Sequence, residues 1–261
     1  MGEASNIEKY INENTKLLWV ETPTNPMMNV IDIEAVSKIA KANNLLLAVD
    51  NTFATPYLQQ PLDLGADIVM HSATKYLGGH SDVVMGSLVV RDEDLADKLY
   101  FIQKASGAIC GPQDSFLVLR GIKTLHLRIQ RHCENGETVA KFLRSHPKIG
   151  KVYWPGFEDH PNHDIAKKQM KGFGGMMSFE LRGGLDFDLF QKKLKLIKSS
   201  MSLAGVESTI LSPSKTSHGL LSPEEREAQG IKDGLMRFSL GIEEKEDLME
   251  DLEQALKEIR G

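Results

Sequence analysis

The first half of the chain alternates short apolar runs with one segment of helical periodicity. Leu17 to Glu21 and Leu45 to Val49 are apolar runs of strand length. Between them, Asp32 is placed to cap a helix, and apolar residues then recur on one helical face at Ile33, Val36, Ile39 and Ala40. A strand, a helix and a strand at this spacing predict a βαβ unit whose two strands are parallel.

The same half carries signals for further strands and for two short helices. The runs Asp67 to His71 and Val83 to Val90 are expected to form a third and a fourth strand. Asn6 to Thr15 is expected to form a short helix, and Gly65 is expected to close another. Together these elements predict an open α/β sheet with mostly parallel strands.

The second half has a different order of elements. Asp114 to Phe142 is mostly helical in pattern, with Gly121 and Gly136 as expected weak points. Ser222 begins a predicted capping box with proline at the first helical position. The later elements are expected to be the strands Met176–Leu181 and Leu235–Leu240 and the helices Phe187–Lys198 and Lys245–Arg260. We therefore expect a first domain over residues 1–125 and a C-terminal α+β domain over residues 126–261.

Composition removes several classes of function. The 261 residues carry a formal net charge of -5, which provides no basic footprint for a nucleic acid. No apolar run approaches the length of a membrane span, and the polar, acidic start has no signal-peptide pattern. The two cysteines, Cys110 and Cys133, do not make a disulfide framework, which favours a reducing cytoplasm.

Polar residues follow the predicted strands at the edge where such sheets bind ligands. Asn25, Asp50 and Lys75 all come after the carboxyl end of an apolar run. In an open α/β sheet the loops at these ends form the ligand crevice. Three polar residues at one rim therefore predict a site, although Asn25 has an alternative role in stabilising its turn.

Lys75 and Asp50 suggest Schiff-base chemistry with a pyridinium cofactor. Lys75 follows an apolar strand among small, polar and glycine neighbours, where partial desolvation lowers the pKa of the amine and makes it nucleophilic. Ser72 and Thr74 alternate on the same strand end and are placed to face one phosphate, or only to shape a turn. Asp50 is placed to pair with a protonated ring nitrogen, or only to cap a turn.

The second half offers one more candidate for substrate binding. Arg237 lies inside a predicted strand, where it is a bidentate clamp for a carboxylate, an outward-facing residue of an alternating strand or a member of a structural ion pair. His160 and His163 have the look of a metal pair, but Pro161 separates them and no third ligand is evident, so we expect no metal site.

Several longer motifs match one enzyme family in the right order. The chain resembles the Cys/Met-metabolism family of pyridoxal-phosphate enzymes, which includes cystathionine γ-synthase, cystathionine γ-lyase, cystathionine β-lyase and methionine γ-lyase. The likeness covers nearly all of the chain. The matching motifs are Glu21-Thr-Pro-Thr-Asn-Pro26, Val49-Asp-Asn-Thr-Phe-Ala-Thr-Pro56, Ser72-Ala-Thr-Lys-Tyr76, Gly79-His-Ser-Asp82, Ser202-Leu-Ala-Gly-Val-Glu-Ser208, Thr216-Ser-His218 and Arg237-Phe-Ser-Leu-Gly241.

The resemblance implies a type I aminotransferase-like fold with pyridoxal 5′-phosphate on Lys75. Residues 1–125 would be the remainder of the cofactor-binding large domain, and residues 126–261 the C-terminal small domain. Asp50 would pair with the pyridine nitrogen, and Ser72 and Thr74 would bind the phosphate. The residues implied to hold the substrate carboxylate or the cofactor edge are Asn25, Ser202 and Arg237. Lys75 would also take the Cα proton before a β or γ substituent is eliminated.

The resemblance also implies features that this sequence does not contain. Family members carry a further stretch ahead of the position of Met1, with a glycine-rich phosphate loop, a stacking aromatic residue and an arm that reaches a neighbouring subunit. We therefore expect a truncated chain. One alternative to an active enzyme is a non-catalytic fragment that only docks on a complementary subunit.

The reaction expected from the resemblance is a transsulfuration step on a small sulfur amino acid, of the cystathionine γ-synthase or γ-lyase type. Met201 stands where some members of that group carry a glutamate that reads the distal amine of cystathionine. Cystathionine β-lyase, methionine γ-lyase and O-acylhomoserine sulfhydrylase therefore remain alternatives. Family members form dimer-based tetramers, so a homo-oligomer is also expected.

Overall fold

The computed structural model describes residues 4–183 and 185–259, which form two compact units. Unit 1 contains residues 1–23, 29–125 and 162–171, and unit 2 contains residues 24–28, 126–161 and 172–261. The expectation that residues 1–125 and 126–261 have separate roles as a cofactor domain and a small domain stays a prediction.

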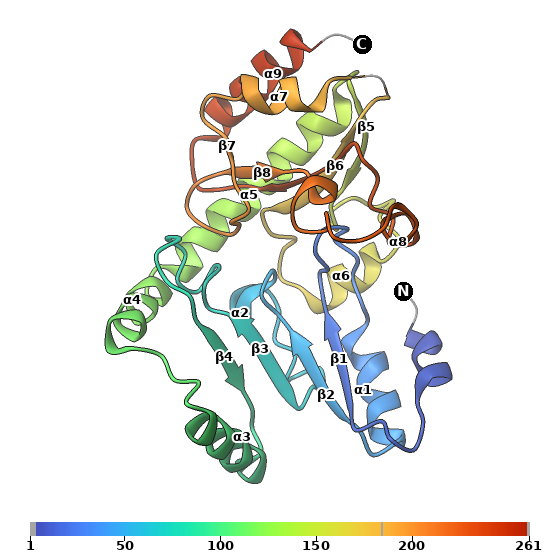
Figure 1. Ribbon diagram of the computed structural model, residues 1–261, viewed down its shortest axis with the longest axis vertical. Helices are drawn as coiled ribbons and strands as arrows, with labels where there is room; N and C mark the ends of the chain where they lie inside the picture. Colours follow the sequence, from blue (N-terminus) through green and yellow to red (C-terminus); the bar gives the residue numbers. More distant parts are fainter. Residues whose placement is uncertain (1–3, 184, 260–261) are drawn as a thin grey trace. The chain divides into compact units, whose positions relative to one another are not determined.

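Unit 1 is built on a four-stranded sheet in the order β1-β2-β3-β4 (Figure 1). β1 pairs with β2, and β2 with β3, in parallel, whereas β4 runs antiparallel to β3. The elements of this unit are η1 (Ala4–Tyr10), β1 (Leu17–Glu21), α1 (Ile33–Ala42), β2 (Leu46–Asp50), α2 (Thr55–Leu58), β3 (Ile68–Ser72), β4 (Gly86–Val89), α3 (Glu93–Ser106), α4 (Pro112–Ile122) and α6 (His163–Gln169). The predicted βαβ unit is confirmed.

One face of this sheet is packed against helix α1, whereas the other face exposes apolar side chains. Asp32 caps α1 by accepting a hydrogen bond from the Ala35 N–H, as predicted. The apolar face of α1 packs on Val20, Leu47 and Val49 to form the core of the unit. Residues of the opposite face, among them Leu17, Trp19, Leu46 and Leu88, are exposed.

Several local predictions in this unit are wrong. The segment expected to be a helix over residues 6–15 is a 3-10 helix that ends at Tyr10. The residues before Gly65 form turns rather than a helix. The helix α3 was not predicted, because none of its residues is buried and its apolar residues 100–102 are consecutive instead of lying on one face.

Unit 2 contains a five-stranded sheet in the order β5-β6-β9-β8-β7. Helices α7 and α9 lie side by side above it in Figure 1 and contribute to its core. The elements are α5 (Leu125–Ser145, of which Leu125 belongs to unit 1), β5 (Ile149–Tyr153), β6 (Met176–Leu181), α7 (Phe187–Lys193), β7 (Lys198–Ser199), β8 (Thr209–Leu211), η2 (Pro213–Lys215), α8 (Pro223–Ala228), β9 (Leu235–Ser239) and α9 (Lys245–Glu258).

The sheet of unit 2 is buried on both faces at its centre. Met177, Phe179 and Phe238 point to the core formed with α5, α7 and α9. Arg237 and Ser239 alternate with them on the other face and are buried as well. The reading of Arg237 as an outward-facing strand residue is therefore wrong.

The predicted boundaries of the later helices need two corrections. The capping box at Ser222 is present, with both of its hydrogen bonds. α7 ends at Lys193 rather than Lys198, because the chain then turns into the short strand β7. Arg260, the predicted end of the last helix, lies outside the described residues. None of the helices among the described residues is long and apolar enough to cross a membrane.

Candidate active site

Lys75 lies on a tight turn that follows β3. Its N–H donates to the Ser72 carbonyl at 3.1 Å, and its own carbonyl accepts the Gly79 N–H at 2.7 Å. Gly79 has a φ of 78°, the left-handed conformation that glycine adopts without strain. The half-buried Lys75 is therefore held on a fixed backbone at the carboxyl end of the sheet.

Helix α4 supports this turn from within unit 1. A Cβ at Gly121 would overlap the Gly78 carbonyl oxygen and would lie 2.7 Å from the Leu77 carbonyl oxygen. Gly78 has no room for a side chain either, since its Cβ would lie 2.8 Å from Val83 Cγ1. Gly121, which the sequence marked only as a helix weak point, is thus the place where α4 touches the Lys75 turn.

Asp50 lies at the carboxyl end of β2, and its side chain is fixed by Thr52. Oδ1 of Asp50 accepts the Thr52 N–H at 3.0 Å and the Thr52 hydroxyl at 2.6 Å. Oδ2 has no hydrogen bond to any described residue, and the side chain is half-buried. One carboxylate oxygen is thus anchored while the other is available to a ligand.

Ser72 and Thr74 differ in what their hydroxyls do. Ser72 lies two residues beyond Met70, which pairs with Asp50, so the Ser72 and Asp50 side chains are on the same face of the sheet. The Ser72 hydroxyl forms no hydrogen bond with a described residue. The Thr74 hydroxyl accepts the Met85 N–H at 3.0 Å and donates to the Met85 carbonyl at 3.3 Å, so it is already engaged.

Arg237 is the centre of a second group of polar residues, in unit 2. Its side chain is 3% exposed, and Nη2 donates to the carbonyls of Met201 at 3.0 Å and Ser202 at 3.3 Å. Nε is buried without a hydrogen-bond partner, and no carboxylate of the described residues forms an ion pair with the guanidinium. Burial lowers the pKa of Arg237 to about 10, so it is still a cation at pH 7.

Asn25 belongs to the same unit as Arg237. The segment that contains Asn25 is attached to β6, because the Ser178 hydroxyl donates to the Pro26 carbonyl at 2.7 Å. Ser178 pairs directly with Arg237 across β6 and β9, and both side chains lie on the face away from the core. The Asn25 segment therefore lies over the strands that carry Arg237.

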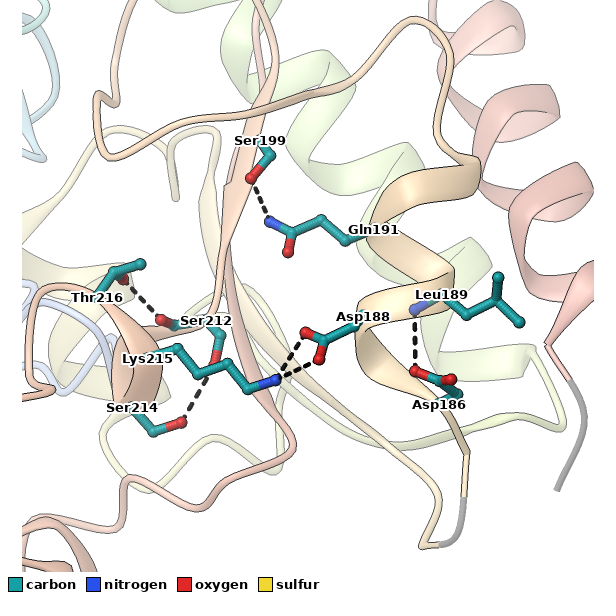
Figure 2. A network of polar contacts seen from close by, with 9 residues as sticks. All are labelled: Asp186, Asp188, Leu189, Gln191, Ser199, Ser212, Ser214, Lys215 and Thr216. Atoms are coloured by element: carbon teal, nitrogen blue, oxygen red, sulfur yellow. Dashed lines mark hydrogen bonds and ion pairs between the residues drawn. The ribbon is translucent and has the colours of Figure 1, made fainter.

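The segment around η2 adds a group that sequence reasoning left without a role, His218. Its pKa is lowered by burial and by the positive charge of Arg237, which indicates that the two side chains are neighbours. Figure 2 shows how the segment is held: Lys215 reaches Asp188 on α7 at 2.6 Å, and the hydroxyls of Ser212 and Ser214 lie 3.1 Å apart.

The structure thus groups the predicted site residues in two sets. Asp50, Ser72, Thr74 and Lys75 lie at the strand ends of unit 1, and Asn25, Ser202 and Arg237 lie in unit 2. Thr52 and His218 were missed. The Asp-x-Thr spacing was the available signal for Thr52, since such side chains bond locally within turns.

His160 and His163, whose spacing resembles that of metal ligands, lie in different units of the chain. His160 Nε2 lies 3.0 Å from the Met28 carbonyl within unit 2, and His163 begins α6 in unit 1. Among the described residues, no group of three or more His, Cys, Asp or Glu side chains is arranged to hold a metal ion.

Known proteins resemble the chain over nearly its whole length. It is 50% identical to an L-methionine gamma-lyase of Fusobacterium nucleatum subsp. polymorphum, over 98% of the chain and 67% of that protein. It is also 50% identical to a cystathionine beta-lyase of Lactococcus lactis subsp. cremoris (strain MG1363), over 98% of the chain and 68% of that protein. The chain therefore spans about two thirds of the length of these relatives.

The fold agrees with these relatives. The crystal structure of cystathionine gamma-lyase from Lactobacillus plantarum complexed with L-serine matches with a TM-score of 0.96 and 46% identity, over 98% of the chain and 67% of that structure. This confirms the predicted type I fold of pyridoxal-phosphate enzymes. The model of the family described as Cys/Met metabolism PLP-dependent enzyme, whose cofactor is pyridoxal 5′-phosphate, matches residues 1–257. The chain belongs to the family of Cys/Met metabolism PLP-dependent enzymes.

Proposed function

We propose that this chain binds pyridoxal phosphate in unit 1 and uses it to cleave the C–S bond of a small sulfur amino acid. Lys75 would hold the cofactor covalently, because a half-buried amine on a fixed turn is suited to react with an aldehyde. Asp50 would pair with the ring nitrogen, and Ser72 and Thr74 would bind the phosphate.

The residues at the strand ends fit this cofactor. Asp50 Oδ2 is an available acceptor for a protonated ring nitrogen, and the Ser72 hydroxyl is an available donor on the same face. Thr74 fits less directly, because its hydroxyl must leave the Met85 main chain before it can donate to a phosphate. We therefore expect Ser72 to contribute more than Thr74 to cofactor affinity.

The observation that carries the proposal for the substrate is the buried, unpaired Arg237. An isolated charge inside a protein is costly, so a buried guanidinium without an acid is suited to an anionic ligand. The α-carboxylate of an amino acid matches the planar fork of arginine. The Ser202 carbonyl orients the guanidinium, and Asn25 would contact the cofactor or the substrate from the segment over β6.

In the reaction, the residues of this chain bind and orient the substrate and move protons. Pyridoxal phosphate, when bound, makes the Cα proton of the attached amino acid acidic. We expect the Lys75 amine to accept that proton and the Arg237 guanidinium to hold the α-carboxylate, which fixes the orientation of the Cα–H bond. Loss of the sulfur group from Cβ releases a thiol and yields pyruvate and ammonia after hydrolysis. Loss from Cγ also requires removal of a Cβ proton, and it releases a thiol and yields α-ketobutyrate and ammonia.

The side chain that precedes Ser202 bears on substrate choice. Met201 is 66% exposed and places a thioether, rather than an acid, next to the carbonyls that orient Arg237. Relatives named methionine γ-lyase and cystathionine β-lyase match this chain equally well, so we propose thioether amino acids as the substrate class.

The proposal is tested by incubating the chain with pyridoxal phosphate, reducing it with borohydride and mapping the modified peptide. We expect the adduct on Lys75 and expect Lys75→Ala to lose it, whereas Lys123→Ala, at the C-cap of α4, serves as the control. An adduct spread over exposed lysines, or none, would contradict a cofactor site in this chain. Release of α-ketobutyrate or pyruvate from methionine and cystathionine then separates γ from β elimination.

We also propose that the chain functions as a homo-oligomer in a reducing cytoplasm. Helices α3 and α4 expose large apolar side chains that suit contact with a second copy: Tyr100, Phe101, Ile102, Phe116 and Leu119. Light scattering after size exclusion tests this, since a monomer at micromolar concentration would contradict it. The free thiols Cys110 and Cys133 fit a reducing compartment.

A further inference from the structure

The hydroxyl of Thr52 connects the two sides of the site in unit 1. It accepts the Ser72 N–H at 2.9 Å and lies 2.6 Å from Asp50 Oδ1. A threonine hydroxyl has a single hydrogen, and the Ser72 N–H already donates to its oxygen. The hydroxyl hydrogen therefore goes to Asp50, since among the described residues the only other acceptor in reach, Met70 Sδ, is 4.0 Å away.

The direction of these bonds is the same throughout. The Ser72 N–H donates to Thr52, and Thr52 donates to Asp50 through both its hydroxyl and its own N–H. Both hydrogen bonds that Thr52 donates end on Oδ1 of the Asp50 carboxylate. Oδ2 accepts neither of these hydrogen bonds, so its lone pairs remain available to a ligand. The orientation of the carboxylate is fixed by the two bonds to Oδ1.

The main chain around Thr52 is held by buried amides, so the hydroxyl is not free to move away. The Asn51 N–H donates to the Met70 carbonyl at 2.9 Å. The Asn51 side-chain amide donates to the carbonyls of Thr55 at 3.1 Å and Gln59 at 2.9 Å, and both Asn51 and Gln59 are fully buried. This network fixes the turn that follows β2.

We propose that Thr52 is a positioning residue for the cofactor, acting through Asp50 and Ser72. It selects the orientation of the Asp50 carboxylate that leaves Oδ2 for the ring nitrogen. It also links that carboxylate to the end of β3, which carries the Ser72 hydroxyl. Asp50, which would bind the cofactor ring, and Ser72, which would bind the phosphate, are therefore held in a fixed relative position. This role rests on the proposed function, because it acts on pyridoxal phosphate in the same site.

The test compares Thr52→Ser, which keeps the hydroxyl, with Thr52→Val, which keeps the shape and loses it. Pyridoxal phosphate affinity is measured by absorbance titration, and exchange of the Ser72 amide hydrogen is measured without cofactor. We expect Thr52→Val to weaken cofactor affinity about tenfold, the effect of one hydrogen bond to a charged group. It should also speed Ser72 exchange, whereas Thr52→Ser should keep affinity within about twofold of wild type.

A matched control and a double mutant separate positioning from general damage. Thr15→Val removes a hydroxyl that accepts the Asn12 N–H before β1, away from the strand ends, and should leave cofactor affinity unchanged. In the Asp50→Asn background, Thr52→Val should lose most of its effect, since it acts through that carboxylate. If Thr52→Val does not fold, Thr52→Ala in the same two backgrounds gives the same comparison.

The outcomes distinguish this inference from the proposed function. A wild-type chain that takes up no pyridoxal phosphate on Lys75 removes the proposed function, and the role of Thr52 with it. A wild-type chain that binds the cofactor, with a Thr52→Val variant that binds equally well, overturns the positioning role alone. Full additivity of Thr52→Val and Asp50→Asn also overturns it.

Discussion

The two units of the chain cover their sheets differently. In unit 1, helix α1 packs on one face, while the other exposes apolar side chains, including Trp19 at 53%. In unit 2, the central strands β6 and β9 are buried on both faces and pack against α5, α7 and α9. The candidate residues follow this difference: those of unit 1 are half-buried at open strand ends, and Arg237 of unit 2 is almost fully buried.

The comparison teaches how each unit is suited to its part of the reaction. Half-buried groups such as Lys75 and Asp50 remain accessible to a cofactor that arrives from solvent. A desolvated arginine gains more from each charge-assisted hydrogen bond, because less water competes for it. Substitutions in unit 1 should therefore affect the cofactor, and substitutions in unit 2 should affect the substrate or stability.

The sharpest test of this division is Arg237→Met. Loss of a buried bidentate contact to a carboxylate should raise KM about 100-fold or more, corresponding to about 3 kcal/mol. The cofactor adduct on Lys75 should persist, since the change is in unit 2. Arg182→Met is the control, because Arg182 also donates to a main-chain carbonyl, that of Ile149 at 3.3 Å, but is exposed. Loss of cofactor binding in Arg237→Met would contradict the division in which unit 1 binds the cofactor and unit 2 binds the substrate.

Acid should destabilise unit 2 through His132. This side chain is fully buried, with Nδ1 2.7 Å from the Leu240 carbonyl, and burial lowers its pKa from 6.5 to about 4. The unfolded chain therefore binds a proton that the folded chain does not, at any pH between these values. The contribution is present above pH 6.5 and is lost as the pH falls toward 4, by up to about 3 kcal/mol.

Denaturant unfolding between pH 7 and pH 4.5 measures this contribution. His132→Asn should show a shallower loss of unfolding free energy with acid than the wild type. Only the slopes are compared, since the substitution also changes a hydrogen bond. Equal slopes would assign the acid sensitivity to other groups, such as His71 of unit 1, whose pKa burial also lowers.

A matched pair of glycines contrasts the two units directly. A Cβ at Gly121 would overlap the Gly78 carbonyl under the Lys75 turn, and a Cβ at Gly136 would overlap the Gly174 carbonyl in unit 2. Each alanine variant should lose about 1–3 kcal/mol of unfolding free energy through overpacking. Only Gly121→Ala should also weaken cofactor binding, measured by absorbance titration. Similar cofactor affinity in both variants would show that α4 does not support the turn.

The sequence predicted the elements whose pattern and local chemistry agree. The strands Leu17–Glu21 and Met176–Leu181 and the cap at Asp32 follow from periodicity and side-chain capping. The positions of Lys75 and Asp50 at strand ends follow from the parallel sheet. These features depend on neighbours within a few residues, which is why one sequence suffices for them.

The features that were missed depend on tertiary contacts. The burial of Arg237 depends on segments over its strand that come from distant parts of unit 2. The role of Gly121 depends on a turn more than forty residues earlier in the chain. The bridge through Thr52 depends on the side-chain rotamer and on the register between β2 and β3. The periodicity of apolar residues along a sequence cannot indicate contacts between residues that are far apart in the chain.

The smallest predicted effect concerns strain in the loop that precedes β8. Ala204 has a φ of 61°, and its N–H donates to the buried Ser239 hydroxyl at 2.7 Å, which holds the backbone in this conformation. A residue with a Cβ is disfavoured there, so Ala204→Gly should stabilise the chain by roughly 0.5–1 kcal/mol. The control, Ala96→Gly, lies in exposed helix α3 and should destabilise by about 1 kcal/mol. Opposite signs in denaturant unfolding would place the strain at Ala204, beside the strand of Arg237, whereas equal losses would show that the conformation costs nothing and that the loop is not strained.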